Sequence, residues 1–277
     1  MKNKILCGVS LLAIPVQTFT ISAACTKTYW DFRFDTSKTE TTSRLVKAEI
    51  TRHKDGDTFD VEISEDKGDF KKGQEITIRL AGIDTPEKSV DGRIPDPNEL
   101  KWGEKASKFG KDTLPLGKPV YLFVGEKDGF GRTTADIFFN PKIDKLPTDA
   151  NGQKIHPLTL DMPLSSYSVE ITRAGLTLPY EQDKSKINTY YRIYEYGLIW
   201  YTYNALGLAL KDAYENGRGF YSGWLWWRKT PADFSKVYKI KPLGNAWKPF
   251  WYKEKKSVFT KIEQNQGYIP ENFKRNK

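Results

Sequence analysis

Cysteine and histidine are scarce in this chain, which has two of each among its 277 residues. Cys7 lies inside an apolar run near the N-terminus and Cys25 follows that run, so no disulfide is expected in the rest of the chain. Zinc sites built from histidine and cysteine, histidine acid–base pairs and cysteine nucleophiles are therefore almost excluded. No P-loop or dinucleotide-binding glycine pattern occurs either. Any catalysis must depend on carboxylates, arginines and an oxygen-ligated metal ion.

The first 24 residues have the layout of a secretory signal peptide. Two lysines precede an apolar run at about residues 5–16, and small residues follow it. This run is too short and too interrupted to span a membrane comfortably. The small residues before Cys25 resemble a bacterial lipobox, although Ser22 stands where leucine is usual. We expect removal of residues 1–24, export, and a lipid on Cys25 that anchors the protein to the outer face of the cell membrane. Simple secretion with cleavage near Ala24 is the alternative.

Positive charge is concentrated at the C-terminal end. The chain carries a formal net charge of +9, and residues 229–277 alone hold twelve Lys and Arg against four Asp and Glu. Aromatic residues alternate with lysines in this tail, namely Trp247, Phe250, Trp251 and Tyr252 with Lys248, Lys253, Lys255 and Lys256. Three interpretations stay open: stacking on single-stranded nucleic acid, contact with an anionic membrane, or packing of the aromatic residues on the preceding domain.

Alternation of apolar and polar residues predicts a mainly β domain. The runs on both sides of Asp55-Gly56, within residues 45–63, predict a hairpin. A third strand is expected over 74–83, and two more around a glycine-rich turn within 118–139. Helical spacing predicts helices over 99–114, 166–176 and 202–217. We expect an α+β fold, mainly β, with a five-stranded OB-type Greek-key barrel and about three helices.

The remaining segments divide the chain. Residues 25–44 are polar and threonine-rich, as in a tether between a lipid anchor and a domain. The barrel domain is expected over 45–228, with the proline-containing segment 140–166 as an insertion. Residues 229–277 then form a basic, aromatic extension. The aromatic stretch 187–203 gives no clear pattern.

Carboxylates gather where these strands are expected to meet. Asp57 follows the Asp55-Gly56 turn, Asp84 and Thr85 end the third strand, and Glu87 comes soon after. If the third strand pairs with the hairpin, Asp57 and Asp84 come together. Two carboxylates and a main-chain carbonyl form a site of hard oxygen ligands, which Ca²⁺ accepts.

Two arginines accompany the carboxylates. Arg79 precedes Asp84 on the third strand, and Arg132 follows the turn between the fourth and fifth strands. A metal ion and two guanidinium groups facing one cleft suit a phosphodiester, because each neutralises charge on the phosphorus transition state. Glu87 would then accept a proton from the attacking water. Each of these motifs is weak alone, and their joint order and spacing make the functional interpretation stronger than a structural one.

Five stretches of the sequence resemble the staphylococcal nuclease (thermonuclease) family. They are "DGDT" at 55–58, "RLAGIDTPE" at 79–87, "KWGEKASKF" at 101–109, "DGFGR" at 128–132 and "ITRAGL" at 171–176. The resemblance covers roughly residues 45–228, and the exported N-terminus makes it especially similar to the membrane nuclease lipoproteins of mycoplasmas. It implies a calcium-dependent phosphodiesterase of OB fold that cleaves DNA and RNA and leaves 3′-phosphates.

The resemblance also implies roles for single residues. Asp57, Asp84 and the carbonyl of Thr85 match the metal ligands, Asp55 an acidic neighbour, Arg79, Glu87 and Arg132 the catalytic set, and Tyr180 a tyrosine near the nucleotide. Phe130 stands where some members have tyrosine, so a hydrogen bond to the nucleotide is expected to be missing. The expected cofactor is Ca²⁺, with Mg²⁺ as an alternative, and the expected partners are DNA, RNA and the membrane, with no protein partner. The rival hypothesis is a non-catalytic lipoprotein that binds nucleic acid or a host surface.

Overall fold

The computed structural model describes residues 28–181, 195–223, 229–251 and 267–273. The predictions for the signal peptide, for Cys25 and for Tyr252 lie outside these ranges. The N-terminal segment is residues 28–44, and the C-terminal segment is residues 229–251.

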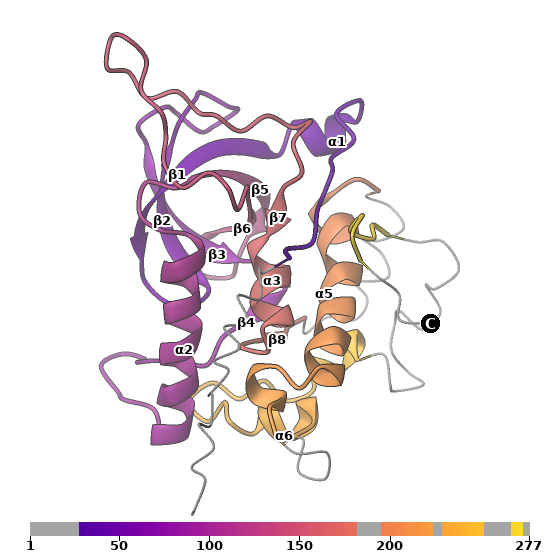
Figure 1. The fold of residues 1–277 in the computed structure, drawn as a ribbon. Coiled ribbons are helices and arrows are strands. Elements are labelled where there is room, and N and C mark those ends of the chain that lie inside the picture. The colour runs from indigo at the N-terminus through magenta and orange to yellow at the C-terminus, as the bar shows by residue number, and fades with distance from the viewer. Residues whose placement is uncertain (1–27, 182–194, 224–228, 252–266, 274–277) are drawn as a thin grey trace, which may run out of the picture.

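Five strands form a closed barrel. They are β1 (Leu45–His53), β2 (Thr58–Ile63), β3 (Glu75–Leu80), β5 (Pro119–Lys127) and β6 (Thr133–Phe139). The strand order is β3-β2-β1-β5-β6, and a parallel pairing of β3 with β6 closes the barrel, with Arg79 opposite Thr134 (Figure 1). The predicted OB-type, mainly β fold is confirmed.

The predicted hairpin is the part of the barrel that leads to the Asp55-Gly56 turn. β1 and β2 pair antiparallel from Ala48↔Ile63 to His53↔Phe59. Phe59, Val61 and Ile63 alternate along β2 and are fully buried, as expected where one face of a strand meets the core. The register of β2 therefore fixes where the turn at its start lies.

Three longer helices accompany the barrel, as predicted: α2 (Pro97–Thr113), α3 (Tyr167–Arg173) and α5 (Leu198–Glu215). α3 and α5 lie side by side, with α2 on the other side of α3 (Figure 1). Four shorter elements were not predicted: α1 (Thr39–Thr42), the 3₁₀ turns Gly219–Tyr221 and Lys248–Phe250, and α6 (Pro231–Ser235). Among the helices in the described ranges, none combines the length and the apolar character needed to cross a bilayer.

The third strand ends earlier than predicted. β3 stops at Leu80, and the chain turns at Gly82, whose φ of 74° lies in the left-handed region. A Cβ at Gly82 would come within 2.8 Å of the ring of Tyr203, so a side chain has no room there. After this turn β4 (Ile83–Asp84) pairs with β8 (Leu178–Pro179). Asp84 therefore lies on a separate short strand beside the barrel.

The N-terminal segment differs from the expected tether, because it packs into the core. Trp30, Phe32 and Phe34 are buried, and Phe32 pairs with Leu164 through two backbone hydrogen bonds. Leu164 belongs to the segment 140–166, which ends in the short strand β7 (Ser165–Ser166) next to β6. The insertion thus supplies a backbone partner for the N-terminal segment.

The C-terminal segment also packs on the domain. Phe234, Tyr238, Trp247, Phe250 and Trp251 are all buried. Of the three interpretations left open for the aromatic tail, the described residues agree with packing on the domain. Trp247, Phe250 and Trp251 therefore present no free ring faces on which bases could stack.

Candidate active site

The turn between β1 and β2 is packed so tightly that its carboxylates have fixed positions. A Cβ on Gly56 would come within 2.9 Å of the Cβ of Ala106 on α2 and within 3.0 Å of the Cγ2 of Thr85. The hydroxyl of buried Tyr167 donates to the carbonyl of Gly56 at 3.0 Å. Glycine is required here because only a hydrogen fits between the helix and the loop, and Asp55 and Asp57 project from either side of it.

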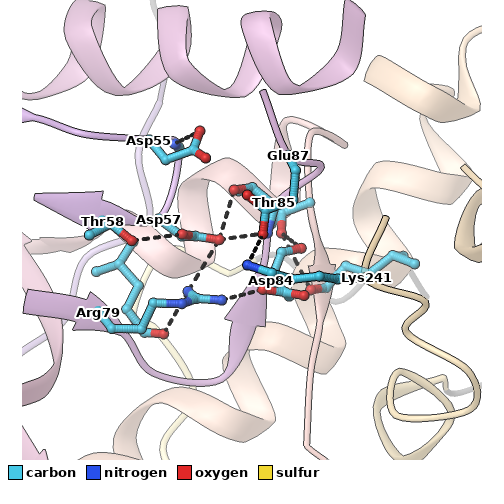
Figure 2. A network of polar contacts seen from close by, with 12 residues as sticks. Asp55, Asp57, Thr58, Arg79, Asp84, Thr85, Glu87 and Lys241 are labelled. Atoms are coloured by element: carbon cyan, nitrogen blue, oxygen red, sulfur yellow. Dashed lines mark hydrogen bonds and ion pairs between the residues drawn. The ribbon is translucent and has the colours of Figure 1, made fainter. Parts of the chain in front are cut away.

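Asp57 joins β2 to the loop that follows β4. Its side chain is buried, and its Oδ2 accepts hydrogen bonds from the backbone N–H and the hydroxyl of Thr85, both at 2.7 Å (Figure 2). Its Oδ1 accepts from the hydroxyl of Thr58 at 3.1 Å. The expected proximity of Asp57 and Thr85, 28 positions apart, is thus present in the structure.

Arg79 lies between the two predicted metal-binding carboxylates. Its Nη1 is 3.2 Å from Oδ2 of Asp57, and its Nη2 forms an ion pair with Oδ1 of Asp84 (Figure 2). The side chain is 15% exposed. Burial lowers the pKa of Arg79, but the charges of Asp57 and Asp84 outweigh it, so the pKa lies above its usual value. Arg79 on β3 thus connects the turn before β2 with β4.

Burial disfavours the ionised forms of two carboxylates in this cluster. Burial, together with the charge of Asp57, raises the pKa of Asp55 to about 7. Burial also raises the pKa of Asp84 to about 7, although Arg79 opposes this shift. Both shifts show that the ionised carboxylates are disfavoured as the site stands, and an additional cation would favour them.

Glu87 lies close to this cluster and binds a residue that the sequence did not indicate. Its Oε1 is 2.5 Å from Nζ of Lys241 in the C-terminal segment (Figure 2). α2 holds the loop of Glu87 in place, because a Cβ on Gly103 would lie 2.7 Å from the carbonyl oxygens of Pro86 and Glu87. Lys241 is 154 positions from Glu87, in a tail whose other lysines look alike, so no sequence signal singled it out.

Arg132 lies near the cluster but has its own partners. It precedes Thr133, which pairs with Ile78, so its backbone is beside β3. Its Nε is 2.7 Å from Oδ2 of Asp128, and its guanidinium lies over the ring of Phe130. The side chain of Arg132 is 39% exposed. The structure thus places Arg132 in the turn just before β6, in contact with residues of its own hairpin.

Tyr180, the predicted nucleotide-contacting residue, follows β8. Its backbone N–H donates to the carbonyl of Gly82 at 2.8 Å, and its side chain is partly buried against the core. This places it next to the short strand that carries Asp84, while its expected contact with a nucleotide stays a prediction.

The donor set suits a hard divalent cation. Within the described ranges, no group of three or more His, Cys, Asp or Glu side chains is arranged to hold a metal ion. The predicted set differs from such a group, because it has two carboxylates and one main-chain carbonyl. Its ligands would all be oxygen atoms, two of them from buried or nearly buried carboxylates. These residues fit Ca²⁺ or Mg²⁺ in their chemistry.

Comparisons with known proteins match the middle of the chain. Residues 77–196 match the family model described as staphylococcal nuclease homologue. A stretch of 141 residues is 31% identical to an uncharacterized lipoprotein of Mycoplasma genitalium, covering 50% of this chain and 47% of that protein. A stretch of 98 residues is 41% identical to an uncharacterized protein of Bacillus anthracis, covering 34% of this chain and 40% of that protein. The chain thus spans less than half the length of these relatives.

The matched range and the structural cluster overlap only in part. Arg79, Asp84, Thr85, Glu87, Arg132 and Tyr180 fall within residues 77–196. Asp57 lies before this range and Lys241 lies after it, yet both contact residues inside it. The cluster therefore draws on more of the chain than the matched range.

Proposed function

Residues 77–196 match the staphylococcal nuclease family, and on this basis we propose that the chain is a Ca²⁺-dependent nuclease that hydrolyses DNA and RNA without sequence preference. The main support is the polar network of Asp57, Arg79 and Asp84. Asp57 comes from the turn before β2, Arg79 from β3 and Asp84 from β4, and the two carboxylates meet at the guanidinium of Arg79.

Asp57, Asp84 and the carbonyl of Thr85 would hold the cation in this proposal. When bound, the cation supplies positive charge against the phosphodiester and the carboxylates. Arg79 keeps the two carboxylates close together, and its guanidinium can share its donors with a phosphate oxygen. Arg132 lies in the turn before β6, and its partly exposed side chain would bind a phosphate oxygen in this proposal.

Glu87 is the proposed base. It accepts a proton from a water molecule, the water oxygen bonds to phosphorus, and the bond from phosphorus to the 5′-oxygen breaks. The products are a 3′-phosphate and a 5′-hydroxyl, whose proton comes from solvent. The loop that carries Glu87 packs against Gly103 of α2, which supports a fixed position for its carboxylate.

Low base specificity follows from the same set of residues. Arg79, Arg132 and the carboxylates are suited to phosphate and metal, which carry no sequence information. A nuclease of this kind would degrade any accessible strand. With a lipid on Cys25 it would act at the cell surface on extracellular nucleic acid and supply nucleotides, and the similarity to a protein named as a lipoprotein supports this location.

Cleavage of a circular plasmid tests the proposal directly. The full chain, purified in detergent, is incubated with plasmid DNA and added Ca²⁺, added Mg²⁺ or chelator. We expect linearisation and degradation with a divalent ion and intact plasmid with chelator. Intact but retarded plasmid under every condition would instead support the non-catalytic binding protein.

The variant Glu87→Gln tests the role of the base. We expect kcat to fall by about 10²–10⁴-fold, because a positioned general base contributes about that much. Glu104→Gln is the matched control, since Glu104 lies exposed on α2 and should leave kcat unchanged. Wild-type kcat in Glu87→Gln would refute the assignment of Glu87.

A further inference from the structure

The C-terminal segment reaches the proposed nuclease site through a buried aromatic anchor. Phe234 packs edge-on against Trp102 of α2 and against Tyr238. The hydroxyl of Tyr238 donates to the carbonyl of Asp84 at 2.7 Å and accepts from the backbone N–H of Leu178 at 3.3 Å. The segment is thus bonded directly to the strand that carries a predicted metal ligand.

A buried glutamate then fixes the backbone just before Lys241. Glu99 on α2 is fully buried, and its Oε2 accepts hydrogen bonds from the backbone N–H groups of Lys239 and Ile240, at 2.9 and 3.1 Å. Hydrogen bonds to a charged acceptor are stronger than those between neutral groups. The position of Lys241 therefore follows from buried contacts on its own segment, independent of its ion pair with Glu87.

The side chain of Lys241 is far more exposed than those of its partner Glu87 and of Arg79. Lys241 is 57% exposed and Glu87 is 14% exposed. Arg79 is 15% exposed and binds two carboxylates. An ammonium group has three donors, and the ion pair with Glu87 uses one of them. Lys241 can thus present positive charge to an incoming anion at this site.

We propose that Lys241 is a substrate-binding residue that takes a backbone phosphate of the nucleic acid and leaves Glu87 as the strand enters. This inference rests on the proposed nuclease function and adds to it a residue from outside the matched range 77–196. The C-terminal segment thereby has a role in the site, because it carries the ammonium group that binds phosphate. When Lys241 moves from Glu87 to a phosphate, Glu87 loses its ion pair and is free to act as the base. A purely structural ion pair is the competing explanation, and exposed pairs of that kind contribute little stability.

Steady-state kinetics on the full chain test this role. For Lys241→Gln we expect KM to rise about three- to tenfold, as for loss of one charged hydrogen bond, with kcat changed by less than about threefold. Lys241→Arg should keep KM near the wild-type value. Lys239→Gln is the matched control, because Lys239 lies on the same segment, is 62% exposed and pairs with Asp96. Its KM should stay within about twofold of wild type.

Salt dependence separates a phosphate contact from a structural ion pair. Binding of a single-stranded oligonucleotide is measured in chelator, where no cleavage is expected, over a range of salt concentrations. The slope of log K against log salt should become shallower by about 0.7 in Lys241→Gln, the value for one phosphate contact on a single strand. The slope should not change in Lys239→Gln or Lys241→Arg.

Two results would overturn the inference. One is an unchanged KM and salt slope in Lys241→Gln, and the other is an equal loss in Lys239→Gln, which would mean that any positive charge nearby suffices. Near-ultraviolet circular dichroism checks that the variants fold. If the wild-type chain cleaves nothing, the proposed nuclease function fails, but the salt slope still decides whether Lys241 binds phosphate.

Discussion

The N-terminal and C-terminal segments lie outside the matched range, and each is bound by a buried glutamate on a helix. The backbone N–H of Trp30 donates to buried Glu170 on α3 at 2.7 Å. The backbone N–H of Lys239 donates to buried Glu99 on α2 at 2.9 Å. In each case a buried carboxylate on a helix accepts hydrogen bonds from a segment distant in sequence.

The two segments differ in what they contact beyond these glutamates. Phe32 and Phe34 of the N-terminal segment pack against Phe138 of the barrel core. The C-terminal segment instead bonds to Asp84 and Glu87 of the proposed site. The N-terminal segment therefore completes the core, and the C-terminal segment contributes to both the core and the site. Stability and activity should respond differently when each is changed.

Deletion of residues 229–277 should have the largest effect. It removes Phe234, Tyr238, Trp247, Phe250 and Trp251, all buried. Loss of a buried aromatic side chain costs about 3–5 kcal/mol, and several together exceed a total stability of about 5–15 kcal/mol. We expect no cooperative thermal transition by circular dichroism. A sharp transition in the truncated chain would show that the domain ends before this segment.

Phe32→Ala should weaken the fold strongly but leave the site intact. Phe32 is fully buried and stacks on Tyr268. We expect the free energy of unfolding to fall by about 3–5 kcal/mol, with an unchanged KM below the melting temperature. Chemical denaturation measures the stability, and Leu116→Ala is the control because that side chain is 57% exposed. A changed KM would contradict the separation of the two segments.

Glu170, which binds the N-terminal segment, should make the stability of the protein depend on pH, with a smaller effect than Phe32→Ala. Burial raises the pKa of Glu170 to about 7 from an ordinary value of 4.5, although Arg173 opposes this. The folded state therefore binds the proton more tightly than the unfolded state, and stability should decrease as pH rises from about 4.5 to about 7. Each unit of pKa difference is worth about 1.4 kcal/mol.

Glu170→Gln isolates this contribution, because other carboxylates also titrate in the same range. Denaturation at several pH values should show a flatter stability profile for Glu170→Gln than for wild type between pH about 4.5 and about 7. Parallel profiles would mean that Glu170 stays ionised through its 2.9 Å ion pair with Arg173.

The sequence was most informative where local chemistry determines structure. The Asp55-Gly56 turn between alternating runs located the hairpin, and Arg79 on the third strand beside it pairs with both Asp57 and Asp84. Two local signals were missed. Trp30, Phe32 and Phe34 alternate with polar residues as in a strand, and Thr230-Pro231 with Asp233 forms a capping box that begins α6.

Other features could not be read from the sequence, because they depend on contacts between distant residues. Lys241 resembles the other lysines of the tail, and only the buried bonds of Tyr238 and Glu99 place it beside Glu87. The early end of β3 at Leu80 likewise depends on the ring of Tyr203, which faces Gly82 from α5. Gly82 is the one local sign of this turn in the sequence, because glycine within a strand pattern often marks a turn or a close backbone approach.

The parallel pairing of β3 with β6 has a consequence for the order of folding. It joins Ile78 to Thr133 across a long stretch of chain, whereas β1, β2 and β3 follow one another as antiparallel neighbours. Pairing of distant segments carries a loop-closure cost and tends to form late. Arg79 lies on one of the two closing strands and Arg132 immediately precedes the other. We therefore expect the backbones of the two arginines to align in the same folding step that closes the barrel.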